Sequence, residues 1–452
     1  MSVNFKDKDL IENEKYLKLV NSVYRGIRDI KTKTYLTQYD LEEDSKYLER
    51  LESATLYNFV KKSVDNLSSV IFRKSLKVDY KVKNEKFIKN IDGKGSSLNQ
   101  FSKEIAKESL KDGLVYIWVD SQRVDSAISI NNIDSVQPYL KLVKRENVLS
   151  KKISFENGIA VLDQIVFQQI ITVSKNEDEF ETEDKNIYIV LNKFGGEIWA
   201  KKEKKENEYE KIDGWVNELG IVPIIPIYSA KTGFLEADIP LLDLSYMNIK
   251  HFNAQSNLDS ILRLAAVPVP IIYTDNEYDK EQLKKEGLTI GVNKALSFSD
   301  KSKEGFEFVE IQGGSIDKLE ANLDKVEESM DKMALSVLAS TSFNTATEAK
   351  IADSNSNLFL MDLAISIEDG LNAAFKIMEL YLDMKLDILI TINKDFDSLG
   401  LDAQTIDKYI ALKREGLISI DTLWDELIKG EILNISDYDV EKQRIRDEEV
   451  VL

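Results

Sequence analysis

The 452-residue sequence has no cysteine and only one histidine, His251. Without cysteine the chain forms no disulfide, thiolate nucleophile or iron–sulfur cluster, and one histidine is too few for a Cys/His zinc site. A serine-histidine triad is possible only around that histidine. We therefore expect no metal and no cofactor, and an ordinary cytoplasm as the compartment in which the chain folds.

Long hydrophobic runs are also missing. No window offers about 18 uninterrupted apolar residues, and the N-terminal stretch MSVNFKDKDLIENEK has no apolar signal core, so we expect neither a membrane span nor secretion. Proline is scarce, and all six prolines lie between Pro138 and Pro270. Helices predicted after Pro270 are therefore uninterrupted by proline.

A phosphate-binding loop is absent as well. Gly93-Lys94-Gly95-Ser96-Ser97 has a superficial likeness to one, but the G-x-x-x-x-G-K-[ST] spacing is missing and no strand precedes it. We favour a solvated turn there over a nucleotide site. The apolar run 114–119 ends in Asp120, as do strands that hold magnesium in ATPases, but without a phosphate loop we favour an ordinary buried strand.

Acidic residues outnumber basic ones, 79 to 60, which gives a formal net charge of −19. A protein that grips nucleic acid needs lysine and arginine to displace counterions from phosphates, so this balance argues against tight DNA binding. It is compatible with a protein past which DNA slides, because an acidic wall repels phosphates.

Three long helices organise the second half of the chain. Helical periodicity predicts them over residues 241–265, 315–337 and 354–389. At 1.5 Å per residue the first two are on the order of 35 Å long and the third on the order of 50 Å, lengths that suit an assembled object better than a catalytic globule. The apolar stripe of the first thins to Ile249, Phe252 and Ala254, which predicts water around most of it. Gly370 predicts a bend in the third.

The second of these helices carries a heptad seam. Its apolar residues alternate steps of three and four, at Ile316, Leu319, Leu323, Val326, Met330, Met333 and Val337. Such a seam packs either against a helix of the same subunit or against a neighbouring subunit, and the sequence leaves both open.

The first two helices flank a compact insert. Strands are predicted within it at 268–273, 288–291 and 306–311, and a short helix at 279–285. Asp275, Glu277 and Asp279 alternate as in a calcium loop, but Lys280 stands where that loop needs glycine, so we favour no metal. The polar connection 340–353 is of the kind that forms either a plain connector or a functional projection.

The rest of the chain is helical at both ends and β-rich between. Helices are predicted over 10–27, 45–71 and 101–112, a small β domain over 138–228 with strands at 164–172, 186–191, 196–200 and 221–228, a strand at 386–393, and helices at 402–413 and 419–429. The last helix is acidic, which favours a structural hairpin over a DNA-reading helix pair. The predicted class is α+β, with two to four domains.

Several short motifs occur in one order along the chain. They are Tyr47-x-x-Arg50 with Ala54 and Tyr57-Asn58, Val70-Ile71-Phe72-Arg73-Lys74, the run 114–120, Gln137-Pro138-Tyr139, Ile221-Val222-Pro223-Ile224, the helix with Leu244, Asn248, His251-Phe252 and Ser256 before Ala265-Ala266-Val267-Pro268, Gly313-Gly314, and Thr345-Ala346-Thr347-Glu348-Ala349. In this order, and with the helix-insert-helix-loop-helix plan, the chain resembles the portal proteins of tailed bacteriophages, the head-to-tail connectors through which DNA is packaged and ejected.

The resemblance implies a portal-type fold of wing, stem, clip and crown. Residues 1–235 would be the wing, with N-terminal helices and a small β-rich subdomain, 236–266 the first stem helix, 267–314 the α/β clip, 315–339 the second stem helix, 340–353 the tunnel loop, 354–400 a long kinked wing helix with a closing strand, and 401–452 the helical crown. Candidates to face DNA in the tunnel loop are Asn344, Thr345, Thr347 and Lys350, the last being its only basic residue. Candidates for the stem or oligomer seam are Leu319, Leu323, Val326, Met330 and Met333.

The resemblance also implies a non-enzymatic ring, usually of twelve subunits, at the portal vertex of a virion assembled in the host bacterial cytoplasm. Implied partners are other copies of the chain, the large terminase subunit, the head-tail adaptor, the major capsid or scaffold protein, and double-stranded DNA passing through the channel, with no membrane. Two alternatives stay open. Another coiled-coil-containing structural or scaffold virion protein would explain the heptads but not the β domain, and a carboxylate-dependent hydrolase would need an acidic pair in an apolar setting, which the sequence does not single out.

Overall fold

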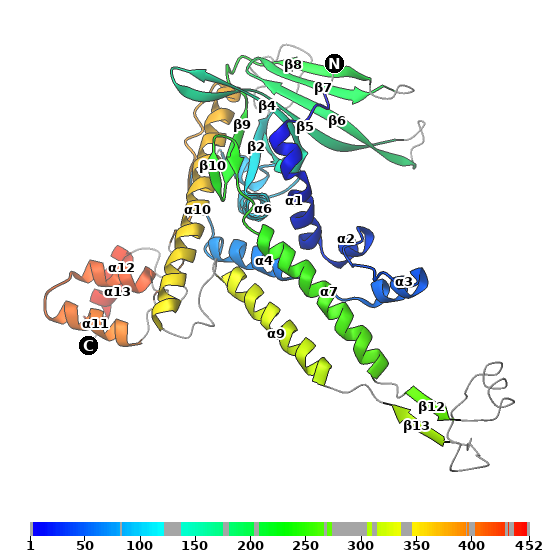
Figure 1. Ribbon diagram of the computed structural model, residues 1–452. Helices are drawn as coiled ribbons and strands as arrows, with labels where there is room; N and C mark the ends of the chain where they lie inside the picture. Colours follow the sequence, from blue (N-terminus) through cyan, green and yellow to red (C-terminus); the bar gives the residue numbers. More distant parts are fainter. Residues whose placement is uncertain are drawn as a thin grey trace. The chain divides into compact units, whose positions relative to one another are not determined.

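The computed structural model describes residues 3–81, 84–121, 137–174, 180–202, 208–265, 269–273, 305–309, 314–335, 346–394, 396, 403–429, 433 and 438–449. The chain divides into two compact units, Met1–Asn393 and Lys394–Leu452. The first combines helices with sheets and the second is helical, as Figure 1 shows. The α+β class predicted from the sequence agrees with this mixture.

Four helices open the first unit: α1 Lys8–Arg25, α2 Ile27–Thr32, α3 Asp44–Ser53 and α4 Phe59–Ile71. The sequence predicts one helix over residues 45–71, and this prediction is wrong. The backbone is extended at Ala54 (φ −62°, ψ 140°). A new helix then starts at Asn58, whose Oδ1 accepts a hydrogen bond from the Lys61 amide at 2.8 Å. Asparagine favours such caps over helix interiors because its side chain replaces a missing backbone partner.

Helix α6 (Leu98–Asp112) leads directly into strand β2 (Leu114–Asp120), after the short elements β1 (Lys77–Asp79) and α5 (Glu85–Lys89). Ser97 and Gln100 form a capping box that starts α6. Gly113 ends it with φ +77°, and a Cβ there would lie 1.7 Å from the carbonyl oxygen of Asp238, so only glycine fits. All seven residues of β2 are buried, which confirms the predicted buried strand.

Two antiparallel sheets form the β-rich part. One has the order β3-β2-β9, with β3 Tyr139–Lys144 and β9 Ile224–Tyr228. The other has the order β4-β5-β6-β7-β8, with β4 Val148–Glu156, β5 Ile159–Ser174, β6 Thr182–Asn192, β7 Gly195–Lys201 and β8 Tyr209–Val216. The sequence analysis found β5, β6, β7 and β9 but missed β3, β4 and β8. Each missed strand lies at a sheet edge, where charged side chains weaken the apolar alternation.

Apolar side chains from both sheets share one core. Trp118 on β2 lies edge-on to Phe167 on β5, with ring centroids 5.5 Å apart, and stacks on Trp215 of β8 at 6.4 Å. Buried residues of β6 complete the cluster: Ile187, Ile189 and Leu191. Aromatic pairs of this kind add to the free energy of burial, so the two sheets form one packed body.

Helices α7 (Leu242–Ala265) and α9 (Gly314–Leu335) confirm the first two long helices, and they lie side by side in Figure 1. Between them the structure describes an antiparallel strand pair, β12 Val269–Tyr273 with β13 Gly305–Val309. Asp275, Glu277 and Asp279 lie outside the described residues. The expectation that water surrounds the middle of α7 is wrong, because Asn248, His251 and Phe252 are fully buried. The Asn248 side-chain amide and His251 Nε2 bond other segments of the chain, so polarity here does not indicate exposure.

Helix α10 (Ala346–Leu382) begins eight residues before and ends seven residues before the predicted third helix, 354–389. Its first residues include Ala346, Glu348 and Ala349, which are strong helix formers. It continues through Gly370, where a Cβ would lie 1.9 Å from Cδ1 of Ile227 on β9. Close packing on β9 therefore explains the glycine that we interpreted as the site of a bend.

The strand predicted at 386–393 is the shorter β14 (Leu389–Thr391), which pairs with β1. The second unit contains α11 (Ala403–Arg414) and α12 (Ile420–Lys429), as predicted, and α13 (Tyr438–Glu449), which the sequence analysis missed. The Tyr409 hydroxyl of α11 donates to Glu426 of α12 at 3.1 Å. Among the described residues no helix combines the length and apolar character needed to cross a membrane.

Candidate functional site

A row of polar side chains along α7 bonds the backbone of the N-terminal helices. Asn248 Oδ1 accepts hydrogen bonds from the amides of Phe59 at 3.0 Å and Val60 at 3.4 Å, and its Nδ2 donates to the carbonyl of Tyr57 at 2.8 Å. The first amides of a helix lack partners within the helix. Asn248 therefore caps α4 from a different helix, together with the local cap Asn58.

The row continues toward the C-terminal end of α7. Asn253 accepts a hydrogen bond from the amide of Thr37 at 2.8 Å and donates to the carbonyl of Tyr35 at 3.0 Å. One turn further on, Asn257 accepts a hydrogen bond from the hydroxyl of Tyr39. Three asparagines on one helix thus hold the segment that runs from α2 into α4, Asn248 and Asn253 by its main chain and Asn257 by the side chain of Tyr39.

Arg50 of α3 is buried where this segment meets α7. Its guanidinium lies 2.6 Å from Glu42 Oε2 and donates to Ser256 Oγ on α7 at 3.5 Å. The group also lies over the rings of Tyr39 and Tyr47, at 4.3 and 5.7 Å from their centroids. The hydrogen bond from Arg50 lowers the pKa of Glu42, so the pair stays charged at neutral pH.

His251 is fully buried between three helices. Its Nε2 lies 2.8 Å from Glu327 Oε1 on α9, and its ring lies edge-on to Tyr57 at 5.4 Å and Phe59 at 6.1 Å. Nδ1 has no hydrogen-bond partner in the part of the chain that is described. These contacts give the chain's single histidine a packing role that ties α7 to α4 and α9.

Two of the motifs that carry the resemblance therefore meet in space. Arg50 and Tyr57 come from one motif, and Asn248, His251 and Ser256 come from another, and the two hydrogen-bonded pairs among them lie 191 and 206 positions apart. We call these five residues the α7 junction. The sequence analysis singled out all five but predicted no contact between them.

The stem seam is packed within the chain over its central part. Leu323, Val326 and Met330 are buried, on the α9 face that contacts α7 and α4. Leu319 and Met333 are half-buried. The central residues of the seam are therefore buried inside one subunit. Leu319 and Met333, on either side of them, are packed less tightly.

The four tunnel-loop candidates are divided between two regions. Asn344 and Thr345 lie outside the described residues. Thr347 and Lys350 lie in the first turns of α10, which begins inside the segment predicted to be a loop. Residues three apart in a helix share a face, so these two candidates lie on one side of α10.

In the turn at 92–97 the backbone amides donate hydrogen bonds to nearby side chains of the same segment. Asp92 Oδ1 accepts hydrogen bonds from the amides of Lys94 at 2.8 Å and Ser96 at 3.0 Å, and Asn90 Oδ1 accepts one from Gly95 at 2.7 Å. Amides that are already bonded cannot cradle a phosphate, which supports the solvated-turn interpretation.

Asp120, at the end of β2, is also engaged by its neighbours. Its Oδ2 accepts hydrogen bonds from Lys141 at 2.8 Å and from the Tyr139 hydroxyl at 3.0 Å. A carboxylate held in this way suits a buried strand end better than a magnesium site. Among the described residues no group of three or more His, Cys, Asp or Glu side chains is placed to hold a metal ion.

The sequence analysis missed a buried carboxylate pair on α6. Burial, and secondarily the neighbouring Glu108 carboxylate, raise the pKa of Asp112 to about 7. Asp112 accepts a hydrogen bond from Asn21 at 2.8 Å, and Glu108 accepts one from Lys111 at 2.8 Å. Both carboxylates are too deeply buried to meet a substrate. The sequence does indicate that this pair is buried, because positions 98, 101, 105, 108 and 112 lie on one face of the helix and the first three are apolar.

The chain was compared with known families, proteins and structures. A family model described as a domain of unknown function, DUF4055, matches residues 240–382, which span α7, the insert, α9 and all of α10. No curated protein matches the sequence.

Solved structures gave weak similarities. A chain in the virion of a native gene transfer agent (GTA) particle is 12% identical at a TM-score of 0.44, covering 87% of this chain and 96% of that one. Chains in the neck of an empty GTA particle with C6 symmetry (12%, TM-score 0.44, 86% and 94% covered) and in the neck of a native GTA particle with C12 symmetry (11%, 0.42, 82% and 89%) are similar to the same degree. Because these TM-scores lie below 0.5, we base no functional conclusion on them.

Proposed function

We propose that this chain is a phage portal protein. Twelve copies form a closed ring at one vertex of the capsid, and double-stranded DNA enters and leaves the head through its centre. Repetition of one heterologous interface until the ring closes is the way in which such an assembly forms from identical subunits.

The observation that carries this proposal is the α7 junction. Residues that carry the likeness to portal proteins, from stretches far apart in the chain, make two direct hydrogen bonds with one another, Arg50 to Ser256 and Asn248 to the carbonyl of Tyr57. A chance likeness of short motifs gives no reason for those residues to be neighbours. If this chain shares the stem base of portal proteins, in which the α7 and α9 pair is anchored to the N-terminal helices, that structure explains why these residues are neighbours.

The net charge of the chain agrees with a conduit for DNA. The net charge of −19 disfavours strong binding to phosphates, so DNA inside such a ring would slide without being held. We propose that the chain is not an enzyme and that the partner terminase supplies the ATPase chemistry of packaging. The insert, residues 267–314, would dock the terminase first and the head-tail adaptor later.

The start of α10 is the proposed DNA-facing element of this account. Thr347 and Lys350 share one face there, and Lys350 would make the weak, reversible phosphate contacts that a sliding duplex tolerates. Asn344 and Thr345 precede that helix in the sequence and stay in the proposal as neighbours along the DNA path.

Labelled particles test the proposed location. An epitope added after Leu452 should bind antibody-gold at one vertex of each particle when virions are viewed by electron microscopy. The same epitope on the major capsid protein would label the whole shell and serves as the control. Label spread over the shell, or confined to the distal tail, would contradict the portal proposal.

A further inference from the structure

Strands β3 and β5 diverge and leave a fork between the two sheets. β3 continues through the single turn η3 (Arg145–Asn147) into β4, which pairs with β5 from Val148 opposite Phe167. On the other side of that turn β3 pairs with β2 instead. From Gln168 onward β5 has β6 as its only paired strand among the described residues. The fork is therefore lined by strand edges on both sides.

The β3 edge presents to this fork main-chain groups that no described residue bonds. β3 is the end strand of its sheet, and the amide of Leu140 points away from β2 to bond the carbonyl of Ile91 at 2.8 Å. Alternate residues of an antiparallel strand point their main-chain groups in the same direction. The N–H and C=O of Leu142 therefore also face away from β2, and no described residue bonds them.

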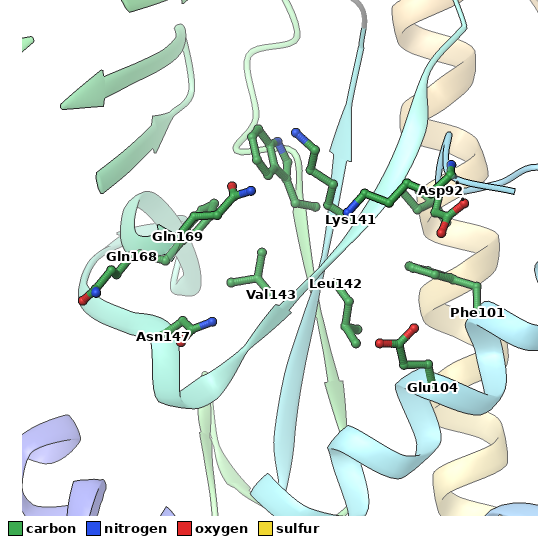
Figure 2. A pocket seen from close by; sticks show the side chains of 13 residues that line it. Asp92, Phe101, Glu104, Lys141, Leu142, Val143, Asn147, Gln168 and Gln169 are labelled. Carbon is green, nitrogen blue, oxygen red and sulfur yellow. Dashed lines mark hydrogen bonds between the residues drawn. The ribbon is translucent and has the colours of Figure 1, made fainter. Parts of the chain in front are cut away.

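A cleft of about 350 Å³ occupies the fork, and Leu142 lies in its lining. Figure 2 shows Asn147, Gln168 and Gln169 along one side, and Asp92, Phe101 and Glu104 along the other. The side with the three amides offers both donors and acceptors without net charge.

The cleft continues outward into a second cavity of about 760 Å³, which shares Lys94, Lys141 and Gln169 with the first. Its apolar lining includes Trp118 and four isoleucines: Ile171, Ile187, Ile189 and Ile198. Ligand sites are commonly hollows of about 300–1,000 Å³ that combine an apolar lining with convergent polar groups; the second cavity supplies the apolar lining and the first cleft the polar groups.

We propose that this fork binds an extended peptide segment of another protein, which adds as a strand to the free edge of β3. A main chain in extended form is the ligand whose donors and acceptors match an open strand edge, and the amide-lined side can bond its second edge. The isoleucine-lined cavity takes one bulky apolar side chain of the segment, because alternate side chains of an added strand point the same way.

The charged groups in the cleft argue against a small anionic ligand. Lys141 is paired with Asp120 at 2.8 Å, and Glu104 adds a second negative charge to that of Asp92. The lining therefore carries no excess of positive charge to hold a phosphate or a free carboxylate. A neutral peptide backbone has no such requirement.

A random octapeptide library on beads tests the proposal with the full-length protein. The wild type should enrich peptides that share one bulky apolar position. Leu142→Pro removes the outward N–H while retaining an apolar side chain, at an edge position where proline is tolerated, and should lower binding of the enriched peptides at least tenfold. Leu142→Val keeps the N–H and should bind as the wild type does.

If Leu142→Pro does not fold, a second variant tests the same proposal. Gln169→Trp fills the fork from the β5 side and should abolish binding while circular dichroism and sizing stay unchanged. Absence of any enriched peptide with the wild type, or equal binding by wild type, Leu142→Pro and Gln169→Trp, would overturn the proposal. Ring formation is not required for this binding, so its failure leaves the proposed function untouched.

Discussion

The side chain of Asn248 on α7 accepts a hydrogen bond from the amide of Phe59 at 3.0 Å, although the two residues lie 189 positions apart. This bond places the start of α4 against the middle of α7. It also accounts for the polar middle of a helix that the apolar pattern alone would expose to water. The junction between α4 and α7 is thus specified by polar side chains as well as by apolar packing.

Asn248→Ala should lower the free energy of unfolding by about 1–2 kcal/mol, because it removes a helix cap and takes the side-chain acceptor from the buried amide of Val60, while the Phe59 amide keeps its bond to the Tyr57 carbonyl at 3.0 Å. Urea unfolding followed by circular dichroism gives this value. Asn13→Ala is the matched control, since Asn13 is partly exposed and its side chain makes an exposed hydrogen bond to the nearby carbonyl of Asp9, and should cost less than about 0.5 kcal/mol. Equal losses in the two variants would show that the contact from α7 is not stabilising.

Met330→Asp should destabilise the single subunit by at least about 4 kcal/mol, because Met330 is fully buried and an unpaired charge would replace it. The measurement is urea unfolding at a concentration where light scattering shows monomer. Ser329→Asp, on the exposed side of the same helix, should leave stability nearly unchanged. A variant with normal monomer stability that fails only to assemble would place the seam between subunits instead.

Gly370→Ala should destabilise the protein by about 1–3 kcal/mol, although alanine is the better helix former by about 1 kcal/mol. The cause is the 1.9 Å approach of the new Cβ to Cδ1 of Ile227. Ile227→Val removes that atom, so Gly370→Ala should cost at least about 1 kcal/mol less in the Ile227→Val background, as a double-mutant cycle measures. A loss that is the same in both backgrounds would show that the glycine serves another purpose.

Asp112 should make stability depend on pH near neutrality. Its pKa is raised to about 7 in the folded protein, above the ordinary value of 3.8, so the folded state holds this proton between those values and the unfolded state does not. The resulting stabilisation is fully present below about pH 4 and is lost as the pH rises to about 7.

The variant Asp112→Asn isolates this effect from carboxylates whose pKa is lowered, such as Glu42 and Glu14, which act in the opposite direction. Between pH 5 and pH 8 the wild type should lose on the order of 2 kcal/mol relative to Asp112→Asn, as urea unfolding at several pH values measures. A difference between the two proteins that does not change with pH would mean that Asp112 is not protonated in the folded state.

Local patterns in the sequence predicted the long elements well. The strand at 114–120 and the helix at 241–265 fall within one residue of β2 and α7. The strand is a continuous apolar run that begins directly after Gly113, and the helix has apolar residues at helical spacing at both of its ends. The heptad residues Leu323, Val326 and Met330 are likewise buried.

The sequence-based predictions are wrong where contacts between residues far apart in the chain determine the local structure. Nothing near Asn248 in the sequence indicates that its amide caps α4, and the break at Ala54 depends on how α3 and α4 pack on α7. Edge strands such as β8 lack the alternation that buried strands show. The buried pair Glu108 and Asp112 continues a visible apolar face, but a pKa shift follows from burial, and burial is a property of the fold.

The mass of the purified assembly tests the central claim most directly. Multi-angle light scattering on a sizing column, with negative-stain electron microscopy of the same fraction, should show rings with a central hole and a mass near twelve times 51.6 kDa, or about 620 kDa. Since association depends on concentration, the measurement should be repeated at the highest concentration the protein tolerates. A monomer or dimer that persists at that concentration would contradict the portal account.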